Sequence, residues 1–181
     1  MNNYYITGDI DNGTFRRFAK FVDSYYCANN DDIIQLIICS DGGCSESSLA
    51  LFDLIKNNPI TINTVAFGLV ASAAAIVFAA GKHRTIMPNA WVMVHEETPG
   101  PEAFADLNVS QIDKLNKHYR RMEDQASEIL ATVTKTSVDK WKELHKNETY
   151  LSAEECLELG LADEIYGRIN DTTIQRKKEV V

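Results

Sequence analysis

Short apolar runs alternate with amphipathic segments along the first half of the chain. Tyr4 to Ile10 predicts a strand, and Thr14 is placed to cap the helix that follows it. A nearly continuous apolar run, Ile33 to Cys39, is typical of a strand that is covered on both faces. After the break at Ser40 to Gly43, a second helix is predicted by one apolar face, made of Leu49, Phe52 and Ile55.

The segment from residue 60 to residue 80 carries the first candidate for chemistry. A strand from Ile60 to Phe67 is expected to turn at Gly68 into an alanine-rich helix that starts near Ser72. This turn places one hydroxyl at a helix N-terminus, where unpaired N–H groups and the helix dipole favour negative charge. Such a corner suits a serine nucleophile, whose acyl intermediate carries an oxyanion. The alternative is an ordinary N-cap serine.

Two short strands follow, Arg84 to Met87 and Trp91 to His95. Strands that alternate with helices in this way predict an α/β fold of repeated β-β-α units. His95 ends its strand beside a loop, so it either reaches into a cleft or merely caps the strand. Gly42 and Gly43 also follow a strand, and they either let the backbone approach a ligand closely or form a plain turn.

The second half begins with a polar connection, Glu96 to Ala105, and then takes on helical periodicity. Apolar residues recur at helical spacing from Leu107 to Val133, which predicts a long helix with a single apolar stripe. Because its other face is polar, we expect this helix to project from the globular body and to find partners. The remaining expected elements are a helix at Ser137 to His145, a capping box at Ser152 to Glu155 with a helix ending at Gly160, a strand near Asp163 to Tyr166, and a disordered tail over residues 171–181.

Composition narrows the classes of function. The 181 residues are most simply one domain, and a formal net charge of -8 argues against a nucleic-acid partner, which would need clustered Lys and Arg. The longest apolar stretch, Leu69 to Ala80, is too short to span a bilayer, and the start of the chain lacks the basic and apolar regions of a signal peptide. We therefore expect a cytoplasmic protein with no membrane partner.

The cysteines and histidines show no metal-binding pattern. The four cysteines form no CxxC pair, so we expect free thiols in a reducing cytosol. The four histidines form no pair at ligand spacing, so we expect no zinc site, and nothing points to another cofactor. The residues concerned are Cys27, Cys39, Cys44, Cys156, His83, His95, His118 and His145.

Four motifs, taken together, resemble those of one protein family. Residues 37–43 (IICSDGG) are similar to I-N-S-P-G-G, residues 68–73 (GLVASA) to G-Q-A-A-S-M, and residues 87–95 (MPNAWVMVH) to L-P-N-S-R-V-M-I-H. Residues 151–165, with LSAEE followed by GLADEI, are similar to the ending L-S-A-x-E-A-x-x-Y-G-L-V-D-x-I. In this order the motifs identify the chain as a divergent member of the Clp protease proteolytic subunits, serine peptidases that assemble into rings.

The resemblance implies a fold and a division of the chain. The fold would be a Clp/crotonase-like superhelix of repeated β-β-α units with a projecting long helix, the handle. A single peptidase domain would cover residues 1–170, with a head made of residues 1–95 and 147–170 and a handle made of residues 96–146.

The resemblance also implies roles for individual residues. Ser72 would be the nucleophile and His95 its general base, while the backbone N–H groups of Gly43 and Ala73 would form the oxyanion hole. The substrate-binding residues would be Gly42, Glu96, Glu97 and Thr98.

The third catalytic position departs from the family pattern. The aspartate of the family lies four residues before the serine of L-S-A, and Glu148 stands there in this chain. One added methylene moves the carboxylate by about 1.5 Å, so Glu148 reaches His95 only if the backbone is displaced. Asn147 is the alternative orienting group, and a solvated loop with no third member is the other. Asp163, within the closing motif, is expected to be structural.

The function implied is hydrolysis of unfolded polypeptides or short peptides by a serine endopeptidase, through an acyl-enzyme on Ser72 inside an oligomeric chamber. The expected partners are further copies of the chain, in a heptameric ring or stacked rings, and a polypeptide substrate. Only residues 1–3 precede the first strand, where family members carry the segment that meets a Clp unfoldase ATPase, so we expect activity that is ATP-independent or gated by a partner. The alternatives are a catalytically inactive structural subunit that assembles with an active paralogue and a crotonase-like acyl-CoA enzyme.

Overall fold

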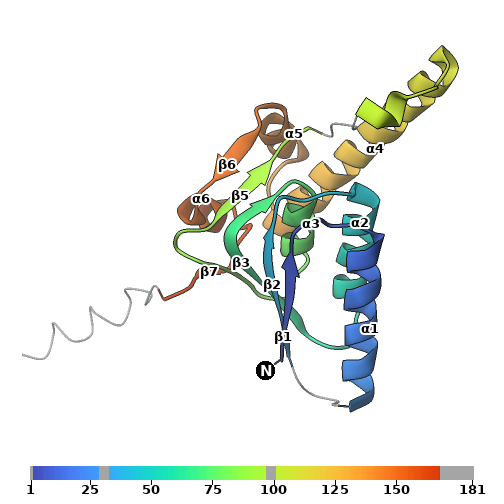
Figure 1. The fold of residues 1–181 in the computed structure, drawn as a ribbon. Coiled ribbons are helices and arrows are strands. Elements are labelled where there is room, and N and C mark those ends of the chain that lie inside the picture. The colour runs from blue at the N-terminus through green and yellow to red at the C-terminus, as the bar shows by residue number, and fades with distance from the viewer. Residues whose placement is uncertain (1, 29–32, 97–100, 168–181) are drawn as a thin grey trace, which may run out of the picture.

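A largely parallel sheet lies at the centre of the molecule (Figure 1). The computed structural model describes residues 2–28, 33–96 and 101–167, and seven strands join one sheet within these ranges. They are β1 (Asn2–Thr7), β2 (Ile34–Ser40), β3 (Ile62–Ala71), β4 (Arg84–Ile86), β5 (Trp91–Val94), β6 (Thr149–Leu151) and β7 (Glu164–Ile165). The order is β1-β2-β3-β4-β7, β5 pairs with β3, and β6 pairs with β5 as the one antiparallel pair among them. The predicted α/β class is confirmed.

Three helices from the first half of the chain lie along one face of this sheet (Figure 1). They are α1 (Asn12–Ala28), α2 (Ser45–Lys56) and α3 (Ala73–Ala79). A short 3-10 helix, η1 (Pro101–Phe104), precedes the long helix α4 (Val109–Thr134), and α5 (Val138–Lys146) and α6 (Ala153–Glu158) complete the described part of the chain. The expected tail, residues 171–181, lies outside the described residues.

The strand β3 carries the site and is longer than predicted. It does not end at Gly68 but continues to Ala71, pairing with β4 through Thr64–Ala66 and with β5 through Leu69–Ala71. Gly68 lies between these two stretches with φ 55, in the region where the register against β2 shifts. Because glycine tolerates positive φ at little cost, it lets one strand bend and change partners. The turn into α3 therefore comes at Ser72 and not at Gly68.

The first helix begins earlier than predicted because another residue caps it. Asp11 accepts a hydrogen bond from the backbone N–H of Thr14 at 2.6 Å, and α1 starts at Asn12. Thr14 lies inside the first turn, where its hydroxyl bonds to Asp9 and Asp11. Both Asp and Thr are good capping residues, so spacing alone did not decide between them.

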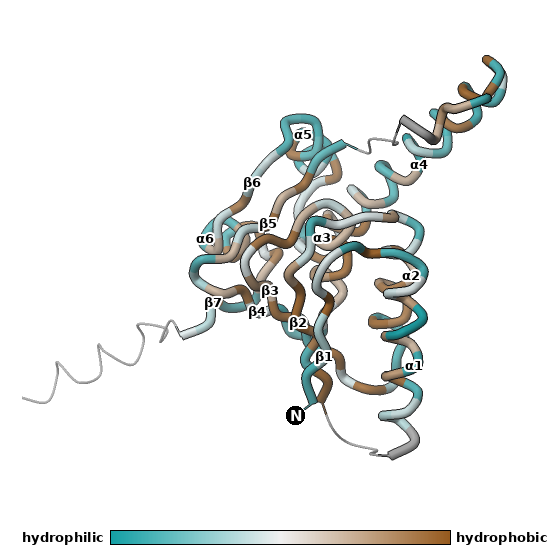
Figure 2. Tube along the Cα trace, viewed as in Figure 1, coloured by the Kyte–Doolittle hydropathy of each residue, from teal (hydrophilic) through white to brown (hydrophobic). Residues whose placement is uncertain are grey.

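The hydrophobic core lies between the sheet and the helices on its covered face. All seven residues of α3 are buried, and Ile34, Leu36 and Ile38 of β2 point to the same side. Figure 2 shows the hydrophobic colour concentrated in β2, β3 and α3. The other face of β2, with Ile37 half-buried and Cys39 exposed, is not covered by any of the described residues, contrary to the expectation of burial on both sides.

The predicted long helix is confirmed as α4, which extends away from the body at its N-terminal end (Figure 1). Asn108 and Gln111 form a capping box that begins it. Its second half is anchored in the molecule, with Met122, Ser127, Leu130, Ala131 and Thr134 buried, whereas Val109 at the other end is 76% exposed. Among the described residues, no helix has the length and apolar character needed to cross a membrane.

The closing motif builds the last elements as predicted. Ser152 and Glu155 form a capping box at the start of α6, and Gly160 takes φ 74 just beyond its end. Asp163 accepts two side-chain hydrogen bonds from Arg84, at 2.7 and 3.0 Å. Partial burial opposes ionisation of Asp163, but its hydrogen bonds with Arg84 hold the pKa of that carboxyl below its ordinary value. The expected structural role of Asp163 is confirmed.

Candidate active site

Ser72 occupies a strained corner between β3 and α3. Its φ of 55 and ψ of -124 are unusual for a residue other than glycine, and its N–H donates to the carbonyl oxygen of Met93 at 2.8 Å. Ser72 stands at the N-cap position, yet its hydroxyl makes no capping hydrogen bond. The interpretation as an ordinary capping serine therefore fails, because the side chain points elsewhere.

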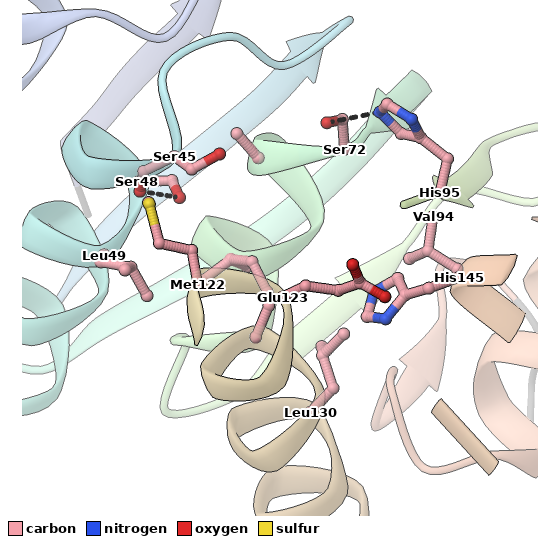
Figure 3. Close-up of a pocket in the computed structure, with 13 residues that line it drawn as sticks. Ser45, Ser48, Leu49, Ser72, Val94, His95, Met122, Glu123, Leu130 and His145 are labelled. Atoms are coloured by element: carbon pink, nitrogen blue, oxygen red, sulfur yellow. Dashed lines mark hydrogen bonds between the residues drawn. The ribbon is translucent and has the colours of Figure 1, made fainter. Parts of the chain in front are cut away.

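The hydroxyl of Ser72 instead meets His95. Oγ lies 2.8 Å from Nε2 of His95, as the dashed line in Figure 3 shows. The register of the sheet explains the meeting: Ala71 is paired with Met93, so the first residue after β3 lies beside the last residues of β5. The parallel pairing of β3 with β5 thus places two residues 23 positions apart at hydrogen-bond distance.

The two glycines bring a backbone segment against this corner. A Cβ on Gly42 would lie 2.7 Å from the carbonyl oxygen of Ala71 and 2.9 Å from Cβ of Ser72, so only glycine fits there. The carbonyl oxygen of Gly42 and the N–H of Cys44 both bond to Ile10, at 2.7 Å each. Backbone groups alternate in direction along an extended chain, so the N–H of Gly43 points away from Ile10.

Two backbone N–H groups remain available beside Ser72. Within the described residues, neither the N–H of Gly43 nor that of Ala73 has a hydrogen-bond partner. The N–H of Ala73 belongs to the first turn of α3, where helix N–H groups lack an internal acceptor. Donors of this kind can stabilise an oxyanion that develops at a carbonyl attacked by Ser72.

The third catalytic candidate does not meet His95 in this structure. Glu148 is exposed and takes φ 46, a conformation that directs the turn after α5. Among the described residues, the side chains of Glu148 and Asn147 form no hydrogen bond or ion pair, although both backbone N–H groups bond within the turn. Neither residue holds the imidazole of His95 here.

A buried histidine from α5 lies near the site and was not predicted. His145 is 5% exposed, and its Nδ1 lies 3.0 Å from Oγ of Ser127 in α4. Burial, together with the charge of His95, lowers the pKa of His145 to about 4, so its ring is neutral at neutral pH. Its position four residues after Trp141, on the buried face of α5, is the sequence signal that could have indicated it.

Ser72, His95 and His145 line one pocket between the head helices and α4. Figure 3 shows the Ser72–His95 pair at one end and Glu123 with His145 at the other. The side walls between them are mostly apolar. The lining residues are Ser45, Ser48, Leu49, Ser72, Ala73, Ile76, Val94, His95, Met122, Glu123, Ala126, Leu130 and His145.

The remaining predicted substrate-binding residues fall in two groups. Gly42 lies against Ser72, as described above, and Glu96 is exposed directly after His95. Glu97 and Thr98 lie outside the described residues. No group of three His, Cys, Asp or Glu side chains in the described part of the chain could hold a metal ion.

Comparison with known proteins agrees with this architecture. The structure of a ClpP1 mutant from Listeria monocytogenes is similar, with a TM-score of 0.82 and 24% sequence identity over 93% of this chain and 93% of that one. The fold is therefore the α/β fold of ClpP and crotonase, with its parallel sheet and long helix α4. Residues 6–168 match the Clp protease family, and the chain belongs to that family.

Proposed function

We propose that the chain is a serine endopeptidase that cleaves unfolded polypeptides or short peptides through an acyl-enzyme on Ser72. The observation that carries the proposal is the 2.8 Å contact between Oγ of Ser72 and Nε2 of His95. A serine that merely capped α3 would bond to the helix backbone, whereas this hydroxyl is aligned with a base. Family membership supports the same reaction class.

The proposed mechanism is acyl transfer in two halves. His95 takes the proton from Ser72 while Oγ attacks the peptide carbonyl, and it then returns that proton to the leaving amine. Water repeats the sequence against the acyl-enzyme, and the carboxylate product leaves Ser72 free. In both halves the N–H groups of Gly43 and Ala73 would hold the oxyanion, and one such donor contributes about 3–4 kcal/mol to transition-state stabilisation.

The proposal also includes a third residue that would orient the imidazole of His95. Glu148 is the family position and Asn147 its alternative, and either would contact the imidazole only after the turn at residues 147–148 changes conformation. In this conformation Ser72 and His95 form a dyad, and His95 alone would make both proton transfers.

We propose that several copies assemble into a ring or stacked rings, so that the sites face an enclosed chamber. The uncovered face of the parallel sheet supports assembly, since parallel sheets are normally covered on both faces. This face carries large exposed side chains from four strands, and exposed apolar surface of this kind often marks a protein interface. They are Tyr5 (58%), Phe67 (38%), Trp91 (46%) and Tyr150 (49%).

A cytoplasmic location and activity on short peptides without ATP complete the proposal. Cys39, Cys44 and Cys156 are free thiols, as expected in a reducing compartment. A Clp unfoldase ATPase, as a gating partner, would extend the substrate range to folded proteins.

A fluorophosphonate probe tests the proposal directly. We expect covalent labelling at Ser72, read by intact mass and peptide mapping, and loss of labelling in His95→Ala. His118→Ala, which changes an exposed histidine of α4, is the matched control and should label normally. Folded wild-type protein that takes no label would contradict the peptidase and favour the structural subunit or the crotonase-like acyl-CoA enzyme.

A further inference from the structure

The pocket beside Ser72 offers a substrate side chain little room. The space that the centres of water molecules can occupy in it is about 30 Å³. Since one water needs about 10–15 Å³ on this measure, the pocket has room for about two. Methyl, methylene and hydroxyl groups are close to water in size. The pocket therefore admits about one or two non-hydrogen atoms of a side chain as it stands.

Most of the groups that enclose this space are fixed in place. Val94 of β5 and Leu130 of α4 are 2% and 0% exposed, so both are held in the packed interior. His145 is buried as well, and its ring is held by the 3.0 Å contact with Ser127 described above. Because side chains in protein interiors are packed as closely as in organic crystals, walls of this kind do not move aside freely.

Met122 of α4 forms the wall with the most conformational freedom. Its side chain extends from α4 toward α2, where Ser48 lines the same pocket (Figure 3), and it is 5% exposed. A methionine side chain has three rotatable bonds, so it can leave such a position more readily than Val94 or Leu130 can. Its removal from the interior, however, costs about as much free energy as the burial of a leucine side chain gains. Met122 therefore sets the size limit of the pocket.

We propose that Met122 restricts the residue immediately N-terminal to the scissile bond to a small side chain, that of glycine, alanine or serine. The carbonyl that Ser72 attacks belongs to this residue, so its side chain is the one that enters the pocket beside Ser72. Alanine or serine would fill the available space, whereas the branched side chain of leucine would overfill it. This inference rests on the proposed peptidase activity and specifies its substrate class.

Peptide substrates that differ only at that position test the inference. With Ala, Ser, Leu or Phe before a fluorogenic leaving group, we expect kcat/KM of the wild type to be highest for Ala and Ser. Met122→Ala should raise the ratio of the Leu to the Ala value about 10- to 100-fold, because leucine is then buried without displacing another side chain. Met87→Ala is the matched control and should leave the ratio unchanged, since Met87 lines a different cavity, with Phe67 and Tyr166.

A second measurement keeps the test decisive if Met122→Ala folds poorly. Fragments of an unfolded protein digested by the wild type, identified by mass spectrometry, should end chiefly in Gly, Ala or Ser. A wild type that cleaves the Leu or Phe substrate as fast as the Ala substrate would overturn the inference, and so would a Leu-to-Ala ratio that Met122→Ala leaves unchanged. Both results would still be turnover, so the peptidase would stand, whereas absent fluorophosphonate labelling at Ser72 would remove both proposals.

Discussion

The two sides of the candidate site are held in different ways. Ser72 and His95 come at the ends of two strands of one sheet. The pairing of residues 69–71 with residues 91–93 holds their side chains together. The turn after α5, where the third catalytic residue was expected, is exposed, and its Glu148 has no side-chain partner among the described residues. Geometry set by a buried sheet is rigid, whereas geometry set by an exposed turn depends on what packs against it. A single chain therefore forms the Ser72–His95 contact but does not bring a third residue to His95.

The largest effect is expected where a substitution moves a backbone donor beside Ser72, and Gly43→Ala is that substitution. The φ of Gly43 is 139, and a Cβ there would lie 2.4 Å from the carbonyl oxygen of Ile10, so Gly43→Ala must displace the backbone donor. We expect peptidase activity to fall by at least about 100-fold, the loss typical of a missing oxyanion donor. Steady-state kinetics on a short peptide measures this.

Gly8→Ala is the control for that substitution. Gly8 also has a positive φ, 85, but nothing lies within 4 Å of the position of its Cβ. It shares the backbone strain without the steric contact, so its activity should stay near that of the wild type. Equal losses in the two variants would show that strain, and not the position of the N–H, limits the rate.

The buried histidine between the two sides should make stability depend on pH. In the unfolded chain His145 has a pKa of 6.5, and in the folded chain about 4. Between these values the unfolded chain binds a proton that the folded chain does not, so the free energy of unfolding falls as the pH drops. Between pH 7.5 and pH 4.5, protonation of His145 in the unfolded chain should lower the free energy of unfolding by about 2 kcal/mol.

His145→Gln should remove that part of the pH dependence. Urea unfolding at both pH values measures it, and His118→Gln, which changes an exposed histidine, should behave as the wild type does. A loss on acidification as large in His145→Gln as in the wild type would mean that carboxyl groups alone account for it.

Glu148→Ala tests whether the turn after α5 supplies the group that orients His95. Because Glu148 has no contact with His95 in this conformation, we expect its kcat to fall less than about tenfold, against about 10⁴-fold for an orienting carboxylate in a working triad. Asn147→Ala is measured alongside it. A loss near 10⁴-fold in either variant would show that the turn rearranges in the active assembly and would identify the third member.

The smallest expected effect on stability is at α6, the helix that follows β6. Its capping box joins Ser152 and Glu155, so Ser152→Ala should lower the free energy of unfolding by about 1 kcal/mol without changing kcat. Chemical denaturation and peptide turnover on the same samples check this. A drop in kcat would mean that α6 also positions the turn at Glu148.

What the sequence predicted follows the same division. The α/β class and the long helix were predicted because buried strands and amphipathic helices leave periodic patterns, whereas the pairing of Ser72 with His95 was implied by the resemblance to the Clp protease family. The turn at Gly68 was misplaced, since a glycine inside a strand can mark a bend as well as an end. Whether Glu148 faces His95 depends on the backbone of one exposed turn, which no periodicity encodes.

His145 shows the other limit of sequence analysis. Its helix was predicted but its burial was not, although its spacing from Trp141 could have indicated it. Its proximity to the Ser72 pocket arises from the packing of α4 against both α3 and α5. Contacts between elements far apart in sequence are set by tertiary packing and not by local pattern.

The half-anchored state of α4 has a mechanical consequence. At 1.5 Å per residue its 26 residues span about 39 Å. Met122 and Glu123 lie near the point where the buried second half of the helix meets its exposed first half. Because a helix is stiff, a partner that binds the exposed end around Val109 would also displace Met122 in the wall of the Ser72 pocket. In the proposed ring, a neighbouring subunit that binds this end of α4 would change the pocket without contacting Ser72.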